Sequence, residues 1–423
     1  MDYPALDPLS PFRHLYTLQT PQGEREIYNA VSYCNRCGCC AQVCPSFQLH
    51  LQENFSPRGR NQLLRLALEG KIKLTAKNKV LRTAITSCLL CGRCTAACAG
   101  QVPTAELVLE MRRTLRLRVL PKPLHDSLQT RSLHPRLFSV LARAALIAKR
   151  FGAFAILPKP AWLKALGERL PKRTPALKKV LAQAGIPLTE ENPQQIYLPS
   201  LEAEFILPDI ARKTLVYARQ KARTAVWANT PTGLFDYVYG DLRRCRRVLR
   251  RLLIRHAHTG DGNLPLITDS IDVYTYLRRA PQVFSGRKFW QKRAEKFAAC
   301  VRYVTDIFPP ITDEKPGPAL LDLSSLLSCQ EPAHTRAREI LATLFGKNLV
   351  ECLYTDADTP AFEYVLAAPK DAAEIGLKAV ERIARTHARE VVTLSGLAAL
   401  ELTYLLKKFY PAAEATHFVD VDR

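Results

Sequence analysis

Nine of the thirteen cysteines in this 423-residue chain fall in two short runs between Cys34 and Cys98. The first run reads C-x2-C-x2-C-x3-C-P, and the second, which begins at Cys88, repeats the same three spacings. Three thiolates spaced in this way wrap around one [4Fe–4S] cubane, and the fourth cysteine of each run reaches the neighbouring cluster. The spacing therefore predicts two clusters with crossed ligand sets: Cys34, Cys37, Cys40 and Cys98 for cluster 1, and Cys88, Cys91, Cys94 and Cys44 for cluster 2.

Zinc is the main alternative, because C-x2-C pairs also bind zinc. One zinc site needs only four ligands, whereas eight cysteines stand here in two copies of one spacing, which favours iron–sulfur clusters. Four cysteines per cluster leave no iron open to a substrate, so two neighbouring clusters indicate a short electron relay. Cys39 lies beside Cys40 but does not satisfy both spacings, and we expect it to pack near the cluster without binding it. Pro45 follows the first run and Ala99 the second, so we expect the two turns to differ.

Short helices are expected around the two runs. An irregular lead-in over residues 1–23 precedes a short helix at 24–32, and a leucine-rich helix between the runs stops at Gly70. A further helix is predicted at 106–119, where prolines follow. We therefore assign residues 24–123 to one mostly helical, ferredoxin-like domain that carries both clusters.

The rest of the chain divides into a linker and two larger units, which makes the fold class α+β. Residues 124–189 are predicted to form a basic, amphipathic helical linker. Two α/β units follow at 190–316 and 317–423, and the second contains expected buried strands at 319–323 and 391–394. The pattern is compatible with a diverged repeat of one unit.

The formal net charge of +22 predicts a partner of opposite sign, either a protein surface or an anionic membrane face. Nucleic acid is excluded as a partner, since the chain has no zinc finger, no aromatic RNA-binding motif and no basic tail. Arginines are dense in two places, at Arg112, Arg113, Arg116 and Arg118 and again over residues 243–255. The six arginines assigned as a candidate partner-binding surface are Arg243, Arg244, Arg246, Arg247, Arg250 and Arg251. A solvated helix face explains them equally well.

The first residues lack the basic start and apolar run of a secretory signal, and no apolar stretch is long enough to span a bilayer. We therefore expect a cytoplasmic chain. The amphipathic stretch from His134 to Leu166 could lie peripherally on the inner face of an anionic membrane, or be buried in an interface. No P-loop and no glycine-rich dinucleotide turn is present, so a flavin or nicotinamide is expected on another chain.

The two runs, together with Ser56-Pro57-Arg58-Gly59-Arg60 and a helix near Glu106, resemble the iron–sulfur subunit of glycolate oxidase. The heterodisulfide reductase family and the iron–sulfur subunits of anaerobic glycerol-3-phosphate and lactate dehydrogenases are wider relatives. The resemblance is good over residues 24–120 and fainter beyond. It implies a ferredoxin-like domain followed by two cysteine-rich CCG domains that bind a further cluster. It also implies an assembly that passes electrons from a flavoprotein towards a quinone, a haem or a disulfide.

The C-terminal half departs from that family pattern. Pro231-Thr232-Gly233 stands where the first CCG motif is expected, before a matching Asp236-Tyr237, and a segment near Thr359-Pro360-Ala361 stands at the second. Ser270-Ile271-Asp272 and residues 393–397 replace further family cysteines. The resemblance then implies two degenerate CCG-like domains that serve as a docking surface. The isolated cysteines that remain are expected to be small buried residues rather than ligands of a rebuilt cluster: Cys245, Cys300, Cys329 and Cys352.

Together these observations predict an electron-transfer subunit of a multi-subunit oxidoreductase, rather than a stand-alone enzyme. It would take electrons from a flavoprotein partner, a dehydrogenase of a 2-hydroxyacid such as glycolate or lactate, and pass them to a quinone or other acceptor, with a membrane-bound quinone- or haem-containing protein as a further partner. One alternative is a catalytic, heterodisulfide-reductase-like subunit with a third cluster. The other is a structural adaptor that docks a redox complex to a membrane.

Overall fold

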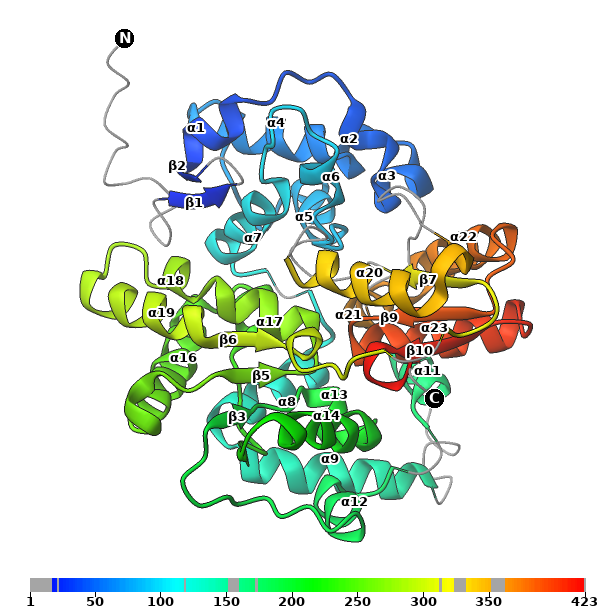
Figure 1. The fold of residues 1–423 in the computed structure, drawn as a ribbon. Helices are drawn as coiled ribbons and strands as arrows, with labels where there is room; N and C mark the ends of the chain where they lie inside the picture. Colours follow the sequence, from blue (N-terminus) through cyan, green and yellow to red (C-terminus); the bar gives the residue numbers. More distant parts are fainter. Residues whose placement is uncertain are drawn as a thin grey trace.

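The computed structural model describes residues 17–20, 23–117, 119–150, 160–171, 174–311, 314–322, 332–350 and 362–421. In Figure 1 the N-terminal helices, in blue and cyan, lie across one end of a larger part that contains two small sheets. The structure is therefore mixed and helix-rich, in line with the predicted fold class. Within the described ranges, every helix is too short or too polar to span a membrane.

A strand pair opens the described chain. Strands β1 (Thr17–Thr20) and β2 (Gly23–Glu26) run antiparallel, and α1 (Ile27–Ser32) follows directly. The expectation of an irregular lead-in over residues 1–23 is wrong for residues 17–20 and 23, which are in strands, while residues 1–16 and 21–22 lie outside the described residues. The first described helix begins at residue 27 rather than 24. Threonine at both ends of β1 favours an extended backbone over a helical or irregular one.

The remaining elements of the N-terminal domain are helical: α2 (Cys39–Gln42), α3 (Pro45–His50), a 3-10 turn η1 (Glu53–Phe55), α4 (Pro57–Leu68), α5 (Lys79–Thr86), α6 (Arg93–Ala96) and α7 (Thr104–Leu115). The predicted stop at Gly70 is confirmed, since α4 ends at Leu68 and Gly70 has a φ of 72°. Helix α7 is shorter than predicted, because Arg116 takes a left-handed conformation and its N–H closes the helix end.

Four described helices follow: α8 (Lys122–Leu133), α9 (Pro135–Arg150), α11 (Ala161–Arg169) and α12 (Leu177–Gln183). Helix α9 packs one side inward through Phe138, whose ring meets that of Phe205 edge-on at 5.5 Å. Its other side exposes large apolar side chains: Leu137, Val140, Leu141 and Ile147. The described part of the predicted amphipathic stretch is therefore helical, and α9 carries apolar residues on both of its sides; residues 151–159 lie outside the described residues.

Two four-stranded parallel sheets form the core of the C-terminal half. The first contains β3 (Gln195–Tyr197), β4 (Thr224–Val226), β5 (Leu266–Thr268) and β6 (Val301–Tyr303). The second contains β7 (Ala319–Asp322), β8 (Leu349–Val350), β9 (Glu390–Thr393) and β10 (Glu414–His417). The predicted strands near 319–323 and 391–394 are confirmed. Numbered within each sheet, both have the strand order 2-1-3-4, which is what a diverged repeat predicts.

Helices surround the two sheets. Those of the first unit are α13 (Leu201–Phe205), α14 (Pro208–Lys221), α15 (Leu234–Val238), α16 (Leu242–Ala257), α17 (Ile271–Arg278), α18 (Ala280–Val283) and α19 (Lys288–Cys300). Those described in the second unit are α20 (Pro332–Phe345), α21 (Phe362–Ala367), α22 (Pro369–Arg385) and α23 (Gly396–Phe409). One continuous apolar core extends from α1 through α7 into both sheets, so the N-terminal helices and the sheet units pack as one body.

Candidate iron–sulfur site

The two cysteine runs fold alike. Arg36 and Leu90 occupy equivalent positions and share a φ of 58°, and Gly38 and Gly92 follow with φ of 91° and 75°. Each glycine then caps a four-residue helix, α2 or α6, which carries the third cysteine of its run. In each loop, two left-handed residues flank the second cysteine of the run. They turn the backbone sharply, so that the loop bends around its cysteines. The repeated spacing thus produces a repeated conformation.

The thiols of the two runs lie close to one another. Burial raises the pKa of Cys94 well above its usual value, and charges on Cys91, Cys88, Cys44 and Cys40 raise it further. Burial likewise raises the pKa of Cys40 to about 12, with added effects from Cys34, Cys98 and Cys44. Such electrostatic effects require short distances. The fourth cysteine of each run therefore lies within electrostatic reach of the helix-borne cysteine of the other.

The exposed loop of the first run is an exception to one expectation. Cys39, predicted to pack near the cluster, is exposed, as is its neighbour Cys37. The reason is local, because the left-handed Gly38 starts α2 at Cys39 and leaves that first helical residue on the solvent side. The expected difference between the two following turns is confirmed: α3 begins directly at Pro45, whereas α7 begins only at Thr104.

A buried arginine stands beside the thiol of Cys44. Arg60 is 1% exposed, and its Nη1 lies 3.8 Å from Cys44 Sγ. Its other nitrogens donate to a ring of acceptors: Ala84 O at 2.6 Å, Ser46 Oγ at 2.8 Å and Ser87 Oγ at 3.0 Å. Charges on Cys88, Cys44 and Cys94 stabilise the guanidinium against the cost of burial. A fixed cation therefore faces the thiols of Cys44 and Cys88.

The segment Ser56-Pro57-Arg58-Gly59-Arg60 builds this arrangement. Ser56 Oγ accepts the N–H of Gly59 at 2.9 Å, which caps α4, and Pro57 occupies the first helical position. A side chain at Gly59 would place its Cβ 2.1 Å from Glu53 O, so only glycine allows the loop to pass this close. Arg58 binds Glu53 through two bonds of 2.7 and 3.0 Å. The segment therefore fixes the position of Arg60 at the start of α4, from which its side chain reaches the thiol of Cys44.

The donor set fits iron–sulfur clusters rather than one ion. Eight cysteines stand at equivalent positions of the two runs, twice the four ligands that one zinc ion needs. A zinc ion needs its four ligands within about 2.3 Å of one centre, whereas a cubane spreads its irons over four corners. The thiols of the two runs, a buried cation and an N–H of Leu90 3.4 Å from Cys88 Sγ match the surroundings that thiolate-bound clusters require.

Comparison with known families agrees with this chemistry. Residues 30–102 match the family model of the 4Fe-4S dicluster domain. By this similarity, residues 30–102 are called the dicluster domain. The predicted resemblance to glycolate oxidase iron–sulfur subunits is also confirmed. The chain is 29% identical over 123 residues to the glycolate oxidase iron-sulfur subunit of Escherichia coli (strain K12), which is 28% of this chain and 29% of that protein.

A second relative gives the same picture. The probable glycolate oxidase iron-sulfur subunit of Bacillus subtilis (strain 168) is 29% identical over 101 residues, 24% of this chain and 22% of that protein. The chain thus spans less than a third of the length of these relatives. No solved structure matches the chain.

The dicluster domain has one face turned to solvent and one packed on the C-terminal half. On the packed face, His50 Nε2 lies 3.1 Å from Asp371 Oδ2, and Lys378 Nζ donates to Gln48 O at 3.3 Å. Arg112, at the end of α7, donates to Cys88 O at 2.7 Å. The loop of Cys88 is therefore bound by α7 through Arg112, while the loop of Cys37 is exposed to solvent.

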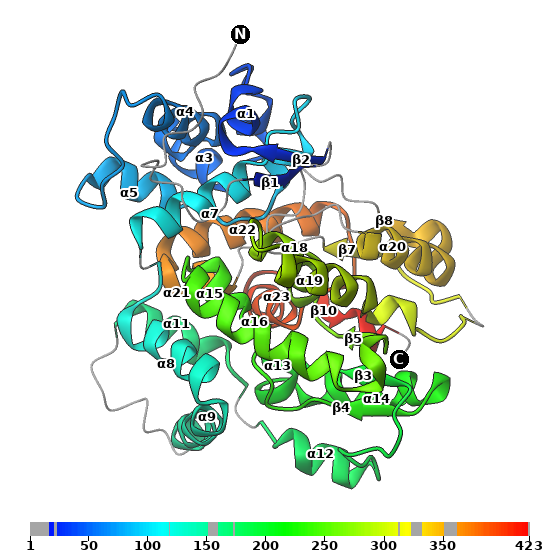
Figure 2. The ribbon, with the colours of Figure 1, turned by 90° about the vertical axis from the view of Figure 1, so that its left-hand side faces the viewer.

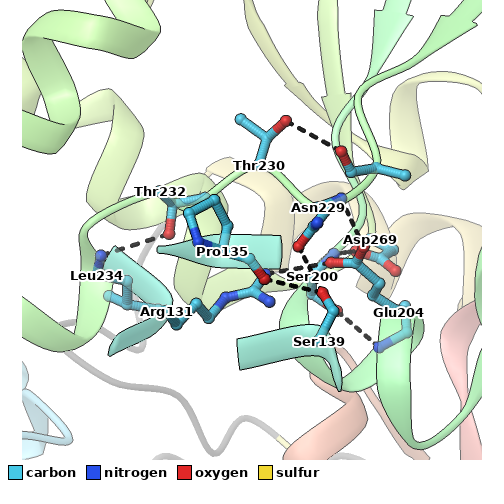
Figure 3. Close-up of polar contacts among 12 residues, drawn as sticks. Arg131, Pro135, Ser139, Ser200, Glu204, Asn229, Thr230, Thr232, Leu234 and Asp269 are labelled. Carbon is cyan, nitrogen blue, oxygen red and sulfur yellow. Dashed lines mark hydrogen bonds and ion pairs between the residues drawn. The ribbon is translucent and has the colours of Figure 1, made fainter. Parts of the chain in front are cut away.

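The described positions at which the family resemblance predicts cysteines, those of the first CCG motif and of two further segments, line one small cavity. Pro231, Thr232, Gly233, Ser270, Asp272 and Leu397 all line a space of about 20 Å³. It lies beyond the carboxyl ends of β3, β4 and β5, where doubly wound sheets commonly bind ligands. Figure 3 shows polar contacts beside it, including the Arg131–Glu204 pair at 3.3 Å and the Ser139–Asn229 bond at 2.7 Å. The cavity has room for about one water molecule.

Buried carboxyl groups lie in and near the lining of this cavity, which contains Glu202 and Asp272. Burial raises the pKa of Glu202 to about 8, and nearby Asp269 and Asp272 add to the effect. Burial also raises the pKa of Asp236 to about 7, although Ser132 donates to it. Ser395 Oγ donates to Asp272 Oδ2 at 2.9 Å and joins the two sheet units. A hydrogen-bonded network therefore fills the junction between the units.

Two of the four isolated cysteines are described. Cys245 is fully buried, with its Sγ 3.2 Å from Tyr276 Oη, in agreement with a packing role. Cys300 ends α19 and is partly exposed, with its Sγ 3.4 Å from Lys296 O. Cys329, Cys352 and Thr359-Pro360-Ala361 lie outside the described residues.

Five of the six arginines predicted as a partner surface line one cleft of about 870 Å³: Arg243, Arg246, Arg247, Arg250 and Arg251. Arg244 does not, because it turns back to Asp241 at 3.3 Å. Figure 2 shows the end of α7 above α16, and this end adds Arg113 and Arg116 to the same cleft. The sequence did show that arginines are dense near residues 112–116. It did not show that they lie next to α16, because that contact forms only in the folded chain.

Proposed function

We propose that this chain relays single electrons through two [4Fe–4S] clusters as a subunit of an oxidoreductase. Cluster 1 would be bound by Cys34, Cys37, Cys40 and Cys98, and cluster 2 by Cys88, Cys91, Cys94 and Cys44. The observation that supports the proposal is that the fourth cysteine of each run acts on the other run: Cys44 acts on Cys91 and Cys94 as well as on Cys40, and Cys98 acts on Cys40. Crossed sets place the two clusters side by side, as a relay requires.

Exposure suggests the direction of the relay. The loop that carries Cys37 and Cys39 is open to solvent, so a partner's cofactor can approach cluster 1 closely. The loop of Cys88 is held by Arg112 and packs on the C-terminal half. Electrons would then enter or leave by cluster 1, and cluster 2 would be the inner site.

The donor follows from the relatives. Both are named as iron-sulfur subunits of glycolate oxidase, which implies a flavoprotein subunit that oxidises a 2-hydroxyacid such as glycolate or lactate. A quinone, or a membrane-bound haem protein, would be the acceptor. Arg243, Arg246, Arg247, Arg250 and Arg251 would supply an anion-binding part of the partner surface. The C-terminal half would act as a degenerate CCG-like docking unit, because its family motif positions surround a cavity too small for a cluster.

A peripheral membrane contact would involve the outer side of α9. Val140 is 64% exposed and Ile147 57% exposed, and the helix carries four basic residues and no acidic one. An apolar stripe with flanking cations is the pattern of helices that lie on anionic bilayers. This contact would hold the chain near a quinone without a spanning helix.

Iron content and cluster identity test the relay. The chain, purified without oxygen, should contain about eight iron atoms. Cys98→Ser should remove the same electron paramagnetic resonance signal as Cys37→Ser, and Cys44→Ser the same signal as Cys91→Ser. If Cys98→Ser instead removed the same signal as Cys91→Ser, each cluster would be bound by the cysteines of one run, and the crossed ligand sets would be refuted. Four irons or fewer, or zinc, would refute the relay, while the control Cys245→Ser should keep all eight.

A further inference from the structure

The arginine cleft, defined as the 870 Å³ space between α7 and α16, has an unusual lining. Five arginines come from one side of α16, two from the end of α7, and Arg287 completes the set. Among the described residues of the lining, Asp241 is the one carboxylate, and Arg244 already engages it. None of the lysines in the described part of the chain lines the cleft. A concave surface with this composition is built for an anion.

Backbone geometry adds to the side chains. Gly240, Asp241 and Leu242 lie in the lining, so the N-terminus of the 16-residue helix α16 opens on the cleft. The first N–H groups of a helix have no partner within it and favour negative charge. One of them, the N–H of Arg244, already donates to Asp241 Oδ1 at 2.9 Å, and the others remain for a ligand. Gly240 has a φ of 87°, and a Cβ there would lie 3.1 Å from Arg113 N. Glycine therefore lets the loop before α16 rest directly on the end of α7.

Two guanidinium groups of the cleft have buried nitrogens that are not hydrogen-bonded. Arg113 is 2% exposed, and its Nη2 is buried without a hydrogen-bond acceptor among the described residues, although its Nη1 binds Glu110 at 3.0 Å. The Nε of Arg250 is likewise buried and unbonded within the described ranges. Burial and the charge of Arg287 lower the pKa of Arg246 to about 10. A multivalent anion would relieve this concentration of positive charge.

The lining favours phosphate groups. Guanidinium binds phosphate oxygens in pairs, which explains the use of arginine rather than lysine. Arg243 and Arg251 are eight residues apart on α16, about 12 Å along the axis, so the charges suit an elongated polyphosphate. His125 lines the same cleft and offers ring surface to a base, beside Tyr239, which is 6% exposed and stacked on Phe235. The volume falls within the range of about 300–1,000 Å³ typical of small-molecule sites.

We propose that the arginine cleft binds a nucleotide that carries a diphosphate or triphosphate. The cleft lies directly behind the proposed cluster 2, because Arg113 lines it while the adjacent Arg112 donates to Cys88 O at 2.7 Å. Resting on the proposed function, this site would place a regulatory or redox-active nucleotide next to the inner cluster. The added negative charge would make cluster 2 harder to reduce.

Calorimetry on the full chain, purified without oxygen, tests the site with ADP, flavin adenine dinucleotide and inorganic tripolyphosphate. We expect saturable binding of one nucleotide per chain at physiological salt. Arg247→Gln with Arg251→Gln should weaken it about 100-fold, near tenfold per lost charged bond. The matched control, Arg223→Gln with Arg385→Gln, removes the same charge from exposed positions elsewhere and should leave binding unchanged.

Three results would overturn the proposal. They are no saturable binding at millimolar nucleotide, equal weakening in the control variant, and tripolyphosphate that binds as tightly as the nucleotides. Binding of an acidic flavoprotein that depends on Arg247 and Arg251, without nucleotide binding, would assign the cleft to that partner instead. Iron content, measured on the same samples, separates this test from the relay: about eight irons without nucleotide binding refutes only the cleft.

Discussion

Arg60 should set the reduction potential of the proposed cluster 2. Replacing it by glutamine removes a buried cation whose Nη1 lies 3.8 Å from Cys44 Sγ. With the charge about 6 Å from the cluster centre and an effective dielectric constant of about 20, the lost interaction is about 3 kcal/mol. For one electron this corresponds to about 120 mV. Because the cation favours the more negative, reduced cluster, the potential should fall in the variant.

Arg60→Lys separates charge from hydrogen bonding. Lysine keeps the positive charge, but it lacks the planar guanidinium that donates hydrogen bonds to Ala84 O, Ser46 Oγ and Ser87 Oγ. Its potential should stay near that of the wild type, while both variants lose about 2–5 kcal/mol of stability, because buried acceptors are left unpaired. The control Arg58→Gln removes an exposed cation near cluster 1 and should leave cluster 2 unchanged.

A redox titration followed by electron paramagnetic resonance measures both clusters in one sample. The expected outcome is a lower potential for one cluster in Arg60→Gln and a much smaller change in Arg60→Lys. Equal potentials in the wild type and Arg60→Gln, with full iron content, would refute the electrostatic role. A shift of the cluster lost in Cys37→Ser, rather than of the one lost in Cys91→Ser, would refute the placement.

Three further predictions follow from other parts of the structure. Burial raises the folded-state pKa of Glu202 from 4.5 to about 8, so the folded chain holds a proton that the unfolded chain has released, and stability should fall as pH rises from about 4.5 to about 8. Glu202→Gln should remove up to about 5 kcal/mol of this dependence in denaturant titrations, and an unchanged slope would contradict it. Gly59→Ala should unfold or strongly destabilise the dicluster domain, because its Cβ would lie 2.1 Å from Glu53 O, whereas Gly167→Ala, with open space, should leave the melting temperature unchanged or higher. Val140→Glu with Ile147→Glu should abolish flotation with anionic liposomes at low salt, and a wild-type chain that does not float would refute the membrane contact.

The sequence predicted what depends on neighbours in the chain. The stop of α4 at Gly70 and the strands near 319 and 391 follow from local patterns, and the structure has them. The strand order shared by both sheets agrees with the suspected repeat. The exposure of Cys39 and the early end of α7 at Arg116 did not follow, because each depends on one left-handed residue.

Features that depend on contacts between residues far apart in the chain could not be predicted from the sequence. The arginine cleft joins Arg113, Arg251 and Arg287, which stand far apart in the chain and carry no common spacing. Arg60 gave no sign of burial, since its partners Ala84 and Ser87 belong to α5 and the residue after it. Charge and family position identified such residues as candidates, but only tertiary contacts show what each one faces.

Helix α7 links the dicluster domain to the C-terminal half. It is buried from Thr104 to Arg113, and it belongs to the same apolar core as α1 and both sheets. Its end presents Arg112 to the loop of Cys88 and Arg113 to the arginine cleft. Because a packed helix moves as a rigid element, a ligand bound in the cleft cannot shift Arg113 without also moving Arg112. The C-terminal half would therefore take part in the relay: its arginines on α16 would hold a bound anion, and α7 carries the residues through which that anion would act on the proposed cluster 2.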